Sequence, residues 1–247
     1  MASEMIGGRN AVNEALKAGK TVDKLYVLDG CEDGPVRTII AKAKKQDAII
    51  RFVPRERLDQ LAGELNHQGV LAQVAAYEYA EVEDILDRAA QKNEPPFLVL
   101  LDEIEDPHNL GAIIRTANLS GAHGVIIPAR RSAGLTNVAA KTSAGAVNYT
   151  PVAKVVNLSR TIEDLKKRGI WFVCADMEAP LMYQCDFTGP VGLVIGNEGK
   201  GVSRLVREKC DFTASIPMKG EIDSLNASVA AGVLCYEVLR QRMAYGK

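Results

Sequence analysis

The side chains best suited to chemistry lie in three polar segments, each of which follows a run of apolar residues. The segments are 102–109, which leads into a helical pattern containing Arg115, then 196–201 and 217–226. Together they offer a guanidinium, the carboxylate of Glu198, amides and a hydroxyl, which are groups that orient polar substrates and assist proton transfer. Ligands bind beyond the carboxyl ends of parallel strands, so three such loops favour one common site.

Arg115 lies in a predicted helix that has no acidic residue one turn away. Gly111 and Leu119 occupy the positions four residues before and after it, so an ordinary helical ion pair is not available. A solvated surface arginine is the simplest interpretation, but the small side chains of Gly111 and Ala112 predict a recess that favours a ligand-facing role. Asn109, at the expected start of the same helix, could cap the helix, face the ligand, or do both.

The glycine-rich segment 196–201 does not fit the known phosphate-binding loops. Its spacing is G-x-x-G-x-G, and Val194 and Gly201 stand where a P-loop requires glycine and Ser or Thr. A nucleotide hydrolase is therefore not favoured, and a tight strand-to-helix turn explains the glycines. A carboxylate such as Glu198 in this turn suits hydrogen bonding to a cation, an amine or a hydroxyl.

Ser224 and Asn226 flank Leu225 just before the last helical pattern. Either polar residue could cap that helix, but a cap does not readily account for both. Ser224 is not part of a G-x-S-x-G motif, so the segment gives no support for a serine hydrolase.

Four short apolar runs, each followed by a helical pattern, predict the strands of this part of the chain: 97–101, 124–127, 170–175 and 191–195. The third polar loop follows a further strand expected at 212–216. Strands that are apolar on both faces are typical of a parallel sheet covered by helices, so we expect an α/β fold. The final helix is expected at residues 225–243. Its first half is crowded with small residues, which indicates either close packing within the domain or a subunit interface.

A smaller α/β domain is expected to precede this one. In residues 1–76, helices are predicted at 10–16, 35–47 and from 54 onward, and strands at 22–28, 49–53 and 70–76. Residues 77–95 are acidic, weakly periodic and bounded by a double proline, and we predict that they form an interdomain linker, in which residues 82–90 could be a helix. Residues 96–247 then make up the second domain.

The composition of the 247-residue chain narrows the classes of protein. The net charge is −1, so any RNA-binding face needs local basic clusters rather than a general attraction to phosphate. No apolar run is long enough to span a bilayer, and the N-terminus lacks the pattern of a signal peptide, which predicts a cytoplasmic protein. The five cysteines have no C-x-x-C spacing and the three histidines form no metal-binding motif, so neither disulfides nor a metal are expected.

The three polar segments, in this order, resemble the three sequence motifs of the SpoU/TrmH family of RNA 2′-O-ribose methyltransferases. The matching stretches are 109–117, 193–201 and 216–230, within a likeness that covers residues 97–240. Residues 5–75 are similar to the ribosomal-protein-like, RNA-binding substrate domain of the ribosomal RNA branch, although Asn10 stands where that branch has histidine. The likeness is greatest to bacterial members that methylate a guanosine ribose in 23S ribosomal RNA.

This resemblance implies a fold and a cofactor that the residue patterns do not reveal. The C-terminal domain would be a trefoil-knotted parallel-sheet methyltransferase domain of the SPOUT type, an exception to the rule against threaded chains. The family also implies a homodimer formed through this domain, in which Arg115 of one subunit can reach the active site of the other. S-adenosyl-L-methionine would bind in the knot through Ile195, Gly196, Ile216, Met218 and Leu225.

Methyl transfer from a sulfonium needs alignment of donor and acceptor and removal of the hydroxyl proton, but no metal. The resemblance implies that Arg115 is the base. Since a guanidinium has a pKa above about 12, Arg115 could instead clamp a neighbouring phosphate, and water or a phosphate oxygen could take the proton. The resemblance further implies that the ribose and the methionine part of the cofactor are oriented by Asn109, Glu198, Ser224 and Asn226.

Arg9, Arg130 and Arg131 are the candidates for contacts to RNA. Arg130 and Arg131 follow the second strand of the C-terminal domain, and an ordinary solvated pair explains them equally well. Two other functions stay open: the same reaction on transfer RNA, and a non-catalytic RNA-binding or ribosome-assembly role. The N-terminal domain disfavours the first, and the complete set of expected active-site residues disfavours the second.

Overall fold

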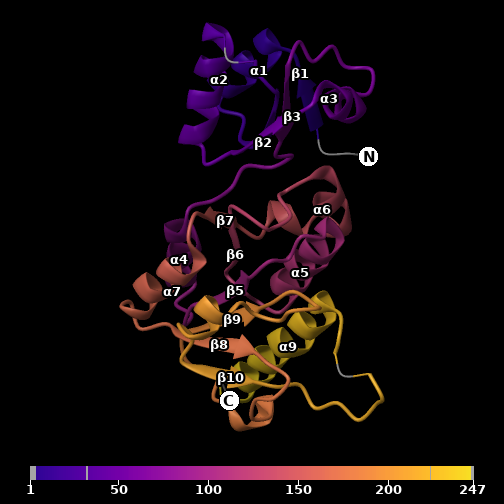
Figure 1. The fold of residues 1–247 in the computed structure, drawn as a ribbon. Coiled ribbons are helices and arrows are strands. Elements are labelled where there is room, and N and C mark those ends of the chain that lie inside the picture. Colours follow the sequence, from indigo (N-terminus) through magenta and orange to yellow (C-terminus); the bar gives the residue numbers. More distant parts are fainter. Residues whose placement is uncertain (1–3, 32, 223, 246–247) are drawn as a thin grey trace. The chain divides into compact units, whose positions relative to one another are not determined.

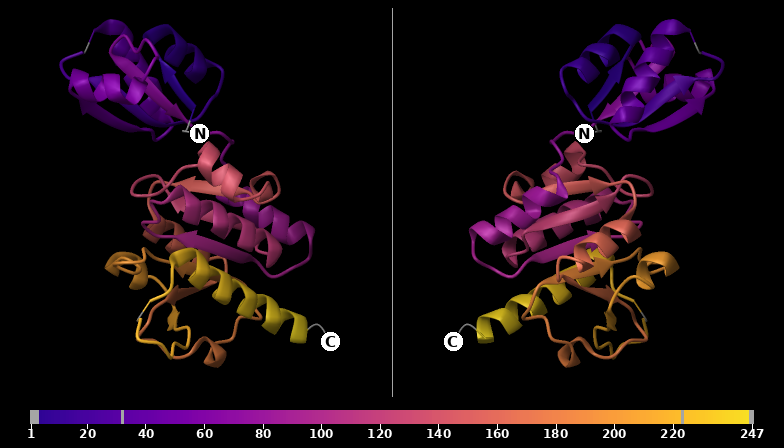
Figure 2. Two further views of the ribbon diagram at one scale, coloured as in Figure 1. Left: turned by 90° about the vertical axis from the view of Figure 1, so that its right-hand side faces the viewer. Right: turned by 90° about the vertical axis from the view of Figure 1, so that its left-hand side faces the viewer.

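The computed structural model describes residues 4–31, 33–222 and 224–245. The chain forms two compact units: the first contains residues up to 78 together with 134–138, and the second contains the remainder. Figure 1 labels their elements, and Figure 2 gives two side views. Each unit has a sheet of its own, as expected for an α/β chain with two domains.

The first unit is a four-stranded mixed sheet with three helices. Its strands are β1 (Glu4–Gly7), β2 (Val22–Leu28), β3 (Ile49–Val53) and β4 (Val70–Val74), in the order β1-β4-β2-β3. Only β2 and β3 run parallel, because β4 pairs antiparallel with both β1 and β2. The helices are α1 (Arg9–Lys17), α2 (Gly34–Lys45) and α3 (Arg55–Ala62). The sequence patterns predict all of these elements except β1, whose four residues are too few to show a period.

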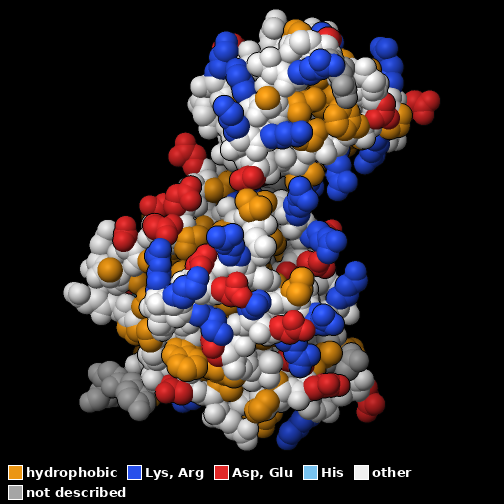
Figure 3. All heavy atoms as spheres, turned by 60° about the vertical axis from the view of Figure 1, so that its left-hand side comes forward, with side chains coloured by type: hydrophobic (Ala, Val, Ile, Leu, Met, Phe, Trp, Pro, Cys, Tyr) orange, Lys and Arg blue, Asp and Glu red, His pale blue; other side chains and the backbone are white. Residues whose placement is uncertain are grey.

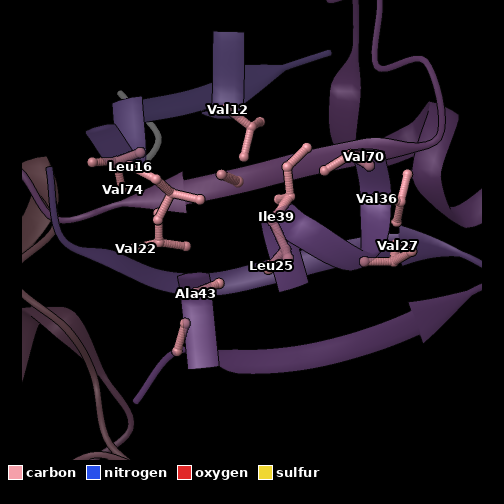
Figure 4. Close-up of a cluster of buried hydrophobic side chains, with 12 residues drawn as sticks. Val12, Leu16, Val22, Leu25, Val27, Val36, Ile39, Ala43, Val70 and Val74 are labelled. Atoms are coloured by element: carbon pink, nitrogen blue, oxygen red, sulfur yellow. The ribbon is translucent and has the colours of Figure 1, made fainter. Parts of the chain in front are cut away.

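Alternation along β2 divides the core of the first unit between two clusters. Leu25 and Val27 pack in the cluster shown in Figure 4, together with apolar side chains of α1 and α2. The intervening Tyr26 and the following Leu28 pack instead against the cluster built around Leu58 of α3. Helices α1 and α2 therefore cover one face of the sheet and α3 covers the other, as the period of two along a strand requires.

The second unit is built on six parallel strands. In spatial order they are β10 (Phe212–Ala214), β8 (Trp171–Ala175), β9 (Val191–Ile195), β5 (Phe97–Leu101), β6 (Gly124–Pro128) and β7 (Val152–Val155). All neighbouring strands pair in parallel, which confirms the predicted sheet. Strand β7 is an additional edge strand, and its short Val-Ala-Lys-Val sequence contains no continuous apolar run.

Helices lie on both faces of this sheet (Figure 2). They are α4 (Val82–Gln91), α5 (Pro107–Leu119), α6 (Asn137–Thr142), α7 (Leu158–Lys166), α8 (Arg204–Arg207) and α9 (Ala227–Tyr245), with single 3-10 turns at Ala146–Asn148 and Met182–Gln184. Helices α4 and α7 share a core cluster through Ile85, Ile162 and Leu165, whereas α5 and α9 pack against each other. None of the described helices combines the length and the hydrophobicity needed to cross a membrane.

Close packing within the unit explains part of the small-residue half of α9. Ala227 and Ala231 are buried, and a Cβ built on Gly232 would lie 3.7 Å from Cγ2 of Thr116 on α5. Small side chains on one helix allow the axis of its neighbour to approach closely. Of the two interpretations of these residues, packing within the domain therefore holds for this face of α9.

The prediction of an interdomain linker at residues 77–95 is wrong for most of this stretch, whereas the helix that was possible at 82–90 is confirmed. Helix α4 occupies its centre and belongs to the second unit, where Ile85 and Ala89 are fully buried. Gly124 of β6 makes room for this contact, since a Cβ on that glycine would lie 2.6 Å from the Ile85 side chain. Val82 and Leu86 are partly buried and pack against the same core, and the acidic residues of α4 face solvent. The apolar positions of α4 therefore follow the period of a helix, and this period is what made the helix predictable.

Arg242 ties α9 to the start of the sheet. Its guanidinium donates hydrogen bonds to the carbonyl oxygens of Pro95 at 2.8 Å, Pro96 at 3.1 Å and Gly189 at 2.7 Å. The guanidinium carbon also lies 5.4 Å from the ring centroid of Phe97. Its Nε also donates to the Phe187 carbonyl oxygen at 3.4 Å. One side chain thus satisfies four carbonyl groups and forms a cation–π contact, so we regard it as the main polar anchor of the last helix.

Arg242→Ala is expected to lower the free energy of unfolding by about 2–4 kcal/mol, because hydrogen bonds from a charged donor are lost together and their acceptors stay partly buried. Urea denaturation followed by the fluorescence of Trp171, the single tryptophan, measures this change. Arg204→Ala is the matched control, since the Arg204 side chain is 85% exposed and forms an ion pair with Glu208, the residue just after its short helix. We expect that control to cost less than about 0.5 kcal/mol. Equal losses in the two variants would contradict the anchoring role.

His123 makes the stability of the second unit depend on pH. The side chain is fully buried, its Nδ1 accepts a hydrogen bond from the Phe97 amide at 3.0 Å, and its Nε2 lies 3.1 Å from the Glu94 carboxylate. Burial lowers the pKa of His123 below its ordinary 6.5, and Glu94 only partly opposes this. The folded chain therefore holds neutral imidazole, with the proton on Nε2.

As pH falls below about 6.5, the unfolded chain takes up a proton at His123 more readily than the folded chain does, so the free energy of unfolding is expected to fall. Above that pH the contribution of His123 is fully present. Urea midpoints measured at about pH 7.5 and about pH 5.5 test this, with His123→Gln as the reference that cannot titrate. An equal pH dependence in the variant would show that another group is responsible.

Candidate active site

A cavity of about 260 Å³ opens beyond the carboxyl ends of β8, β9 and β10. Ala175 and Asp176 line it at the end of β8, residues 195–202 line it after β9, and Ile216 and Met218 line it after β10. Because β10, β8 and β9 are neighbours in the sheet (Figure 1), loops that are distant in the sequence meet here. This is the edge of a parallel sheet at which ligands bind.

The residues expected to hold the cofactor lie together in this cavity. They are Ile195, Gly196, Ile216, Met218 and Leu225, and Glu198 and Ser224 line the cavity as well. Ile195 is buried at the end of its strand, whereas Met218 and Leu225 are 37% and 36% exposed. The cavity thus has an apolar interior and a partly apolar rim, with polar groups added by the loop after β9.

The loop after β9 is a tight turn that needs its glycines for geometric reasons. Asn197 and Gly201 exchange backbone hydrogen bonds of 3.2 and 2.8 Å, and Gly201 has a positive φ of 67°. A Cβ on Gly196 would lie 2.1 Å from the Gly201 carbonyl carbon, so only glycine fits there. The Asn197 amide fixes the turn further by donating to the Glu103 carbonyl oxygen at 3.3 Å. The turn therefore holds Glu198 in a defined place on the cavity wall.

Asn109, Glu198 and Asn226, which come from the three motifs, form one hydrogen-bonded cluster. Oε1 of Glu198 accepts from the Asn109 amide at 2.5 Å and from the Asn226 amide at 2.8 Å. The Asn226 amide also donates to Oδ1 of Asn109 at 3.0 Å. Asn109 is 7% exposed, whereas Glu198 and Asn226 are exposed. The carboxylate thus joins the first turn of α5 to the start of α9.

Of the two asparagines in this cluster, Asn226 also caps its helix, whereas Asn109 does not. Asp106 caps α5 by accepting from the His108 amide at 2.8 Å, so the suggestion that Asn109 is the cap is wrong. This frees the Asn109 side chain for the cluster. Asn226 does cap α9, since its Oδ1 accepts from the Ser228 amide at 3.0 Å. Ser224 is exposed and lines the cavity.

Arg115 lies apart from this cluster within the chain. Its guanidinium is exposed and makes no hydrogen bond or ion pair with any residue that the structure describes. The recess expected beside it does not exist, because a Cβ on Gly111 would lie 2.4 Å from the Ala139 carbonyl oxygen and 2.7 Å from Thr142 Cβ. Gly111 serves close packing against α6 instead. Six residues and about 600° of helix also separate Arg115 from Asn109, so the two side chains leave α5 on different faces.

The three arginines expected to contact RNA differ in how many hydrogen bonds and ion pairs they already form within the chain. Arg9 pairs with Asp33 at 2.7 Å and donates to the Gln68 carbonyl oxygen at 3.1 Å, so it also fixes loops of the first unit. Arg131 pairs with Glu103 at 2.8 Å but keeps a side chain that is 75% exposed. Arg130 is exposed and has no hydrogen-bond or ion-pair partner in the described part of the chain. Figure 3 shows basic side chains scattered over one face of each unit.

Two charged cavity residues, Asp176 and Arg207, were missed by the sequence patterns. Asp176 is the first residue after β8, and its carboxylate forms an ion pair with Arg207 of α8. The signal was available, since the strand at 170–175 was predicted and the next residue is acidic. The four-residue helix α8 gave no apolar period that could place Arg207 beside it.

The thiol of Cys174 at the cavity wall is buried. Its hydrogen bond to Cys210, together with burial, raises the pKa of the Cys210 thiol. Reactive cysteines are partly exposed and have a lowered pKa, so this pair gives no support for covalent catalysis. The cavity instead combines apolar side chains, backbone groups and two carboxylates, Asp176 and Glu198. Such a lining suits a ligand with a flat apolar part, hydroxyl or amine donors and a positive charge.

Comparison with known proteins matches both parts of the chain to family models. Residues 96–236 match the SpoU rRNA Methylase family, and residues 5–80 match the model for RNA 2′-O ribose methyltransferase substrate binding. The chain is also 53% identical, over 97% of its length and 96% of the relative, to the TrmH-family protein YacO of Bacillus subtilis (strain 168).

Solved structures of related enzymes have the same fold. The S-adenosylmethionine-bound rRNA methyltransferase from Sinorhizobium meliloti has a TM-score of 0.59 and 26% identity, over 96% of this chain and 86% of that chain. The TrmH/SpoU tRNA modifying enzyme of A. aeolicus has a TM-score of 0.55 and 31% identity, over 66% of this chain and 85% of that chain. The chain therefore belongs to the SpoU rRNA methylase family and is an RNA methyltransferase that uses S-adenosylmethionine.

Proposed function

We propose that the protein transfers the methyl group of S-adenosylmethionine to the ribose 2′-oxygen of a guanosine in 23S ribosomal RNA. The observation that carries the choice of substrate is the first unit, which matches a substrate-binding model of RNA 2′-O-ribose methyltransferases. The Sinorhizobium rRNA methyltransferase aligns with nearly the whole chain, whereas the tRNA modifying enzyme aligns with two thirds of it. A separate RNA-binding unit suits a long, folded RNA, because contacts away from the target nucleotide help to select it.

The cavity beside Ile195, Ile216 and Leu225 fits the cofactor. Their apolar side chains would cover the adenine ring, while backbone groups of the loop that begins at Gly196 would bind its edge. S-adenosylmethionine supplies an activated methyl group on a sulfonium leaving group. The carboxylates at the cavity suit the positive charge of this molecule.

The cluster of Asn109, Glu198 and Asn226 would position the acceptor ribose. Glu198 is held by two amides, so its carboxylate is fixed before the substrate arrives. Such preorganisation aligns the 2′-hydroxyl without a further loss of side-chain entropy. The hydroxyl of Ser224, exposed at the cavity, would bind the ribose or the methionine part of the cofactor. The displaced proton would pass to water or to a phosphate oxygen, because a guanidinium has no site that accepts a proton.

We infer that the active protein is a homodimer in which Arg115 serves the partner's site. Helices α5 and α9 carry four large apolar side chains that remain exposed in the single chain: Leu119, Val229, Tyr236 and Met243. Covering them in a dimer would remove apolar surface from water. Arg115 lies on the same helix as Leu119 and has no partner in the described chain, which leaves its guanidinium available to clamp an RNA phosphate beside the partner's cluster.

Incubation with tritiated S-adenosylmethionine tests the choice of substrate. Total RNA from a strain that lacks the enzyme is separated into 23S, 16S and transfer RNA after the reaction, and we expect label in 23S RNA alone. Label only in transfer RNA would replace the proposed substrate. Binding of the cofactor with no label in any RNA, including ribosomal precursor particles, would favour the non-catalytic RNA-binding role.

A further inference from the structure

Asp176 lies in the wall of the cavity but outside the three stretches that match the family motifs. Its backbone amide donates to the Ala214 carbonyl oxygen at 3.1 Å, which fixes the residue between the ends of β8 and β10. The side chain is only 14% exposed, and yet it lines the cavity. A charge held so close to the ligand space is either a structural ion pair or part of the ligand site.

The hydrogen bonds of Asp176 leave acceptor capacity on both carboxylate oxygens. Oδ1 accepts one bond, from the Glu178 amide at 3.0 Å, and Oδ2 takes part in the ion pair with Arg207. Each carboxylate oxygen can accept two hydrogen bonds. One acceptor site on each oxygen thus remains for a ligand, in a geometry fixed by the turn and the arginine. A carboxylate with two free acceptor sites matches two neighbouring hydroxyl donors.

The other charged side chains of the cavity do not offer this combination. Glu198 is fixed by Asn109 and Asn226 in the cluster proposed to position the acceptor ribose, and Lys200 and Arg207 have no acceptor. The ribose of a bound nucleoside cofactor has two neighbouring hydroxyls that need acceptors once water is displaced. A carboxylate just past a parallel strand binds ribose hydroxyls in dinucleotide-binding sheets, for the same reason of chemistry and position.

We propose that Asp176 binds the 2′- and 3′-hydroxyls of the cofactor's own ribose, and that Arg207 holds the carboxylate in place for this. This inference rests on the binding of S-adenosylmethionine in the cavity and is independent of which RNA is methylated. Asp176 is a binding residue that selects ribonucleosides, and it takes no part in proton transfer. Arg207 is a positioning residue, because its guanidinium acts through Asp176.

The test combines a change in the protein with a change in the ligand. Binding of 5′-methylthioadenosine, which lacks the amino-acid part of the cofactor, is measured by calorimetry in the absence of RNA, together with its 2′-deoxy and 3′-deoxy forms. For the unchanged protein, removal of one hydroxyl should weaken binding about tenfold or more, since a hydrogen bond to a charged acceptor is lost. In Asp176→Asn the complete ligand should bind about tenfold more weakly, and removal of the same hydroxyl should then change affinity less than about threefold.

Asp211→Asn is the matched control. Asp211 has a side chain that is 15% exposed, pairs with Lys166 at 2.7 Å and accepts from the Phe172 amide at 2.8 Å, but it does not line the cavity. Asp211→Asn loses an equivalent ion pair on the same sheet. Removal of either hydroxyl should weaken ligand binding to this variant as much as it does for the unchanged protein. Loss of that effect in the control would show that the fold, rather than the carboxylate, is responsible.

Two results would overturn the assignment. An equal loss of affinity for the deoxy ligands in Asp176→Asn and in the unchanged protein would mean that Asp176 does not contact the ribose. If Asp176→Asn bound S-adenosylhomocysteine more weakly but 5′-methylthioadenosine as well as the unchanged protein does, Asp176 would instead contact the amino group of the cofactor's amino-acid part. If the unchanged protein bound neither 5′-methylthioadenosine nor S-adenosylhomocysteine, the cofactor site itself would be rejected. Methylation of tRNA in the labelling experiment would change the RNA substrate but leave the ribose contact intact.

Discussion

Replacing Arg115 with alanine is expected to reduce methyl transfer by about a thousandfold or more, while the affinity for S-adenosylmethionine changes less than about twofold. The separation follows from the structure. Arg115 is exposed, lies outside the cavity lining and has no partner in the described chain, so neither fold nor cofactor depends on it. In the proposed dimer, the guanidinium would clamp an RNA phosphate beside the partner's site in the transition state.

Single-turnover rates and calorimetric cofactor binding, measured on the same preparation, check this division of roles. Arg115→Lys should recover little activity, because lysine cannot form a bidentate phosphate contact. Arg204→Ala is the control for loss of an exposed helical arginine, and it should leave the rate unchanged. An Arg115→Ala variant that loses cofactor affinity as strongly as rate would contradict the proposed role.

Mixed dimers of two inactive variants are expected to regain about half of the activity per dimer, if each active site takes Arg115 from one subunit and Glu198 from the other. Glu198→Ala removes the acceptor that joins Asn109 to Asn226, so this variant should be inactive alone. In a dimer of Arg115→Ala with Glu198→Ala, one site carries both changes and the other carries neither. The intact site should then work normally.

Coexpression with two different affinity tags yields the mixed dimer, and its rate is compared with each variant alone. A dimer of Arg115→Ala with itself, carrying the same two tags, controls for the purification. Absence of activity in the mixed dimer would place Arg115 and Glu198 in the same subunit's site. Failure to capture any mixed dimer would contradict the homodimer.

The parallel sheet and the cofactor cavity could be predicted because their signals are local. Each buried strand, such as Val191–Ile195, is a continuous apolar run, and the polar loop directly after it must lie at the carboxyl edge of the sheet. The motifs after β9 and β10 therefore met in one cavity, and the amides of Asn109 and Asn226 met on Glu198.

Other features depend on contacts between distant residues and could not be predicted. Gly111 was interpreted as a recess for a ligand, but α6 fills that space. Helix α4 was assigned to a linker because its stretch is acidic and ends at a double proline, but Ile85 and Ala89 are buried in the second unit. The threading of the chain into a knot and the position of Arg115 in a dimer depend on the path of the chain and on a second copy. Both stay predictions of the family likeness.

Mass spectrometry of nucleosides from the methylated 23S RNA tests the central claim most directly. RNA modified by the purified enzyme with methyl-deuterated S-adenosylmethionine is digested to nucleosides, and the deuterated product is fragmented to separate base from ribose. We expect one labelled species, 2′-O-methylguanosine, with the label on the ribose fragment, and no label after reaction with Arg115→Ala. Label on a base fragment, or on the ribose of a nucleoside other than guanosine, would contradict the proposed reaction.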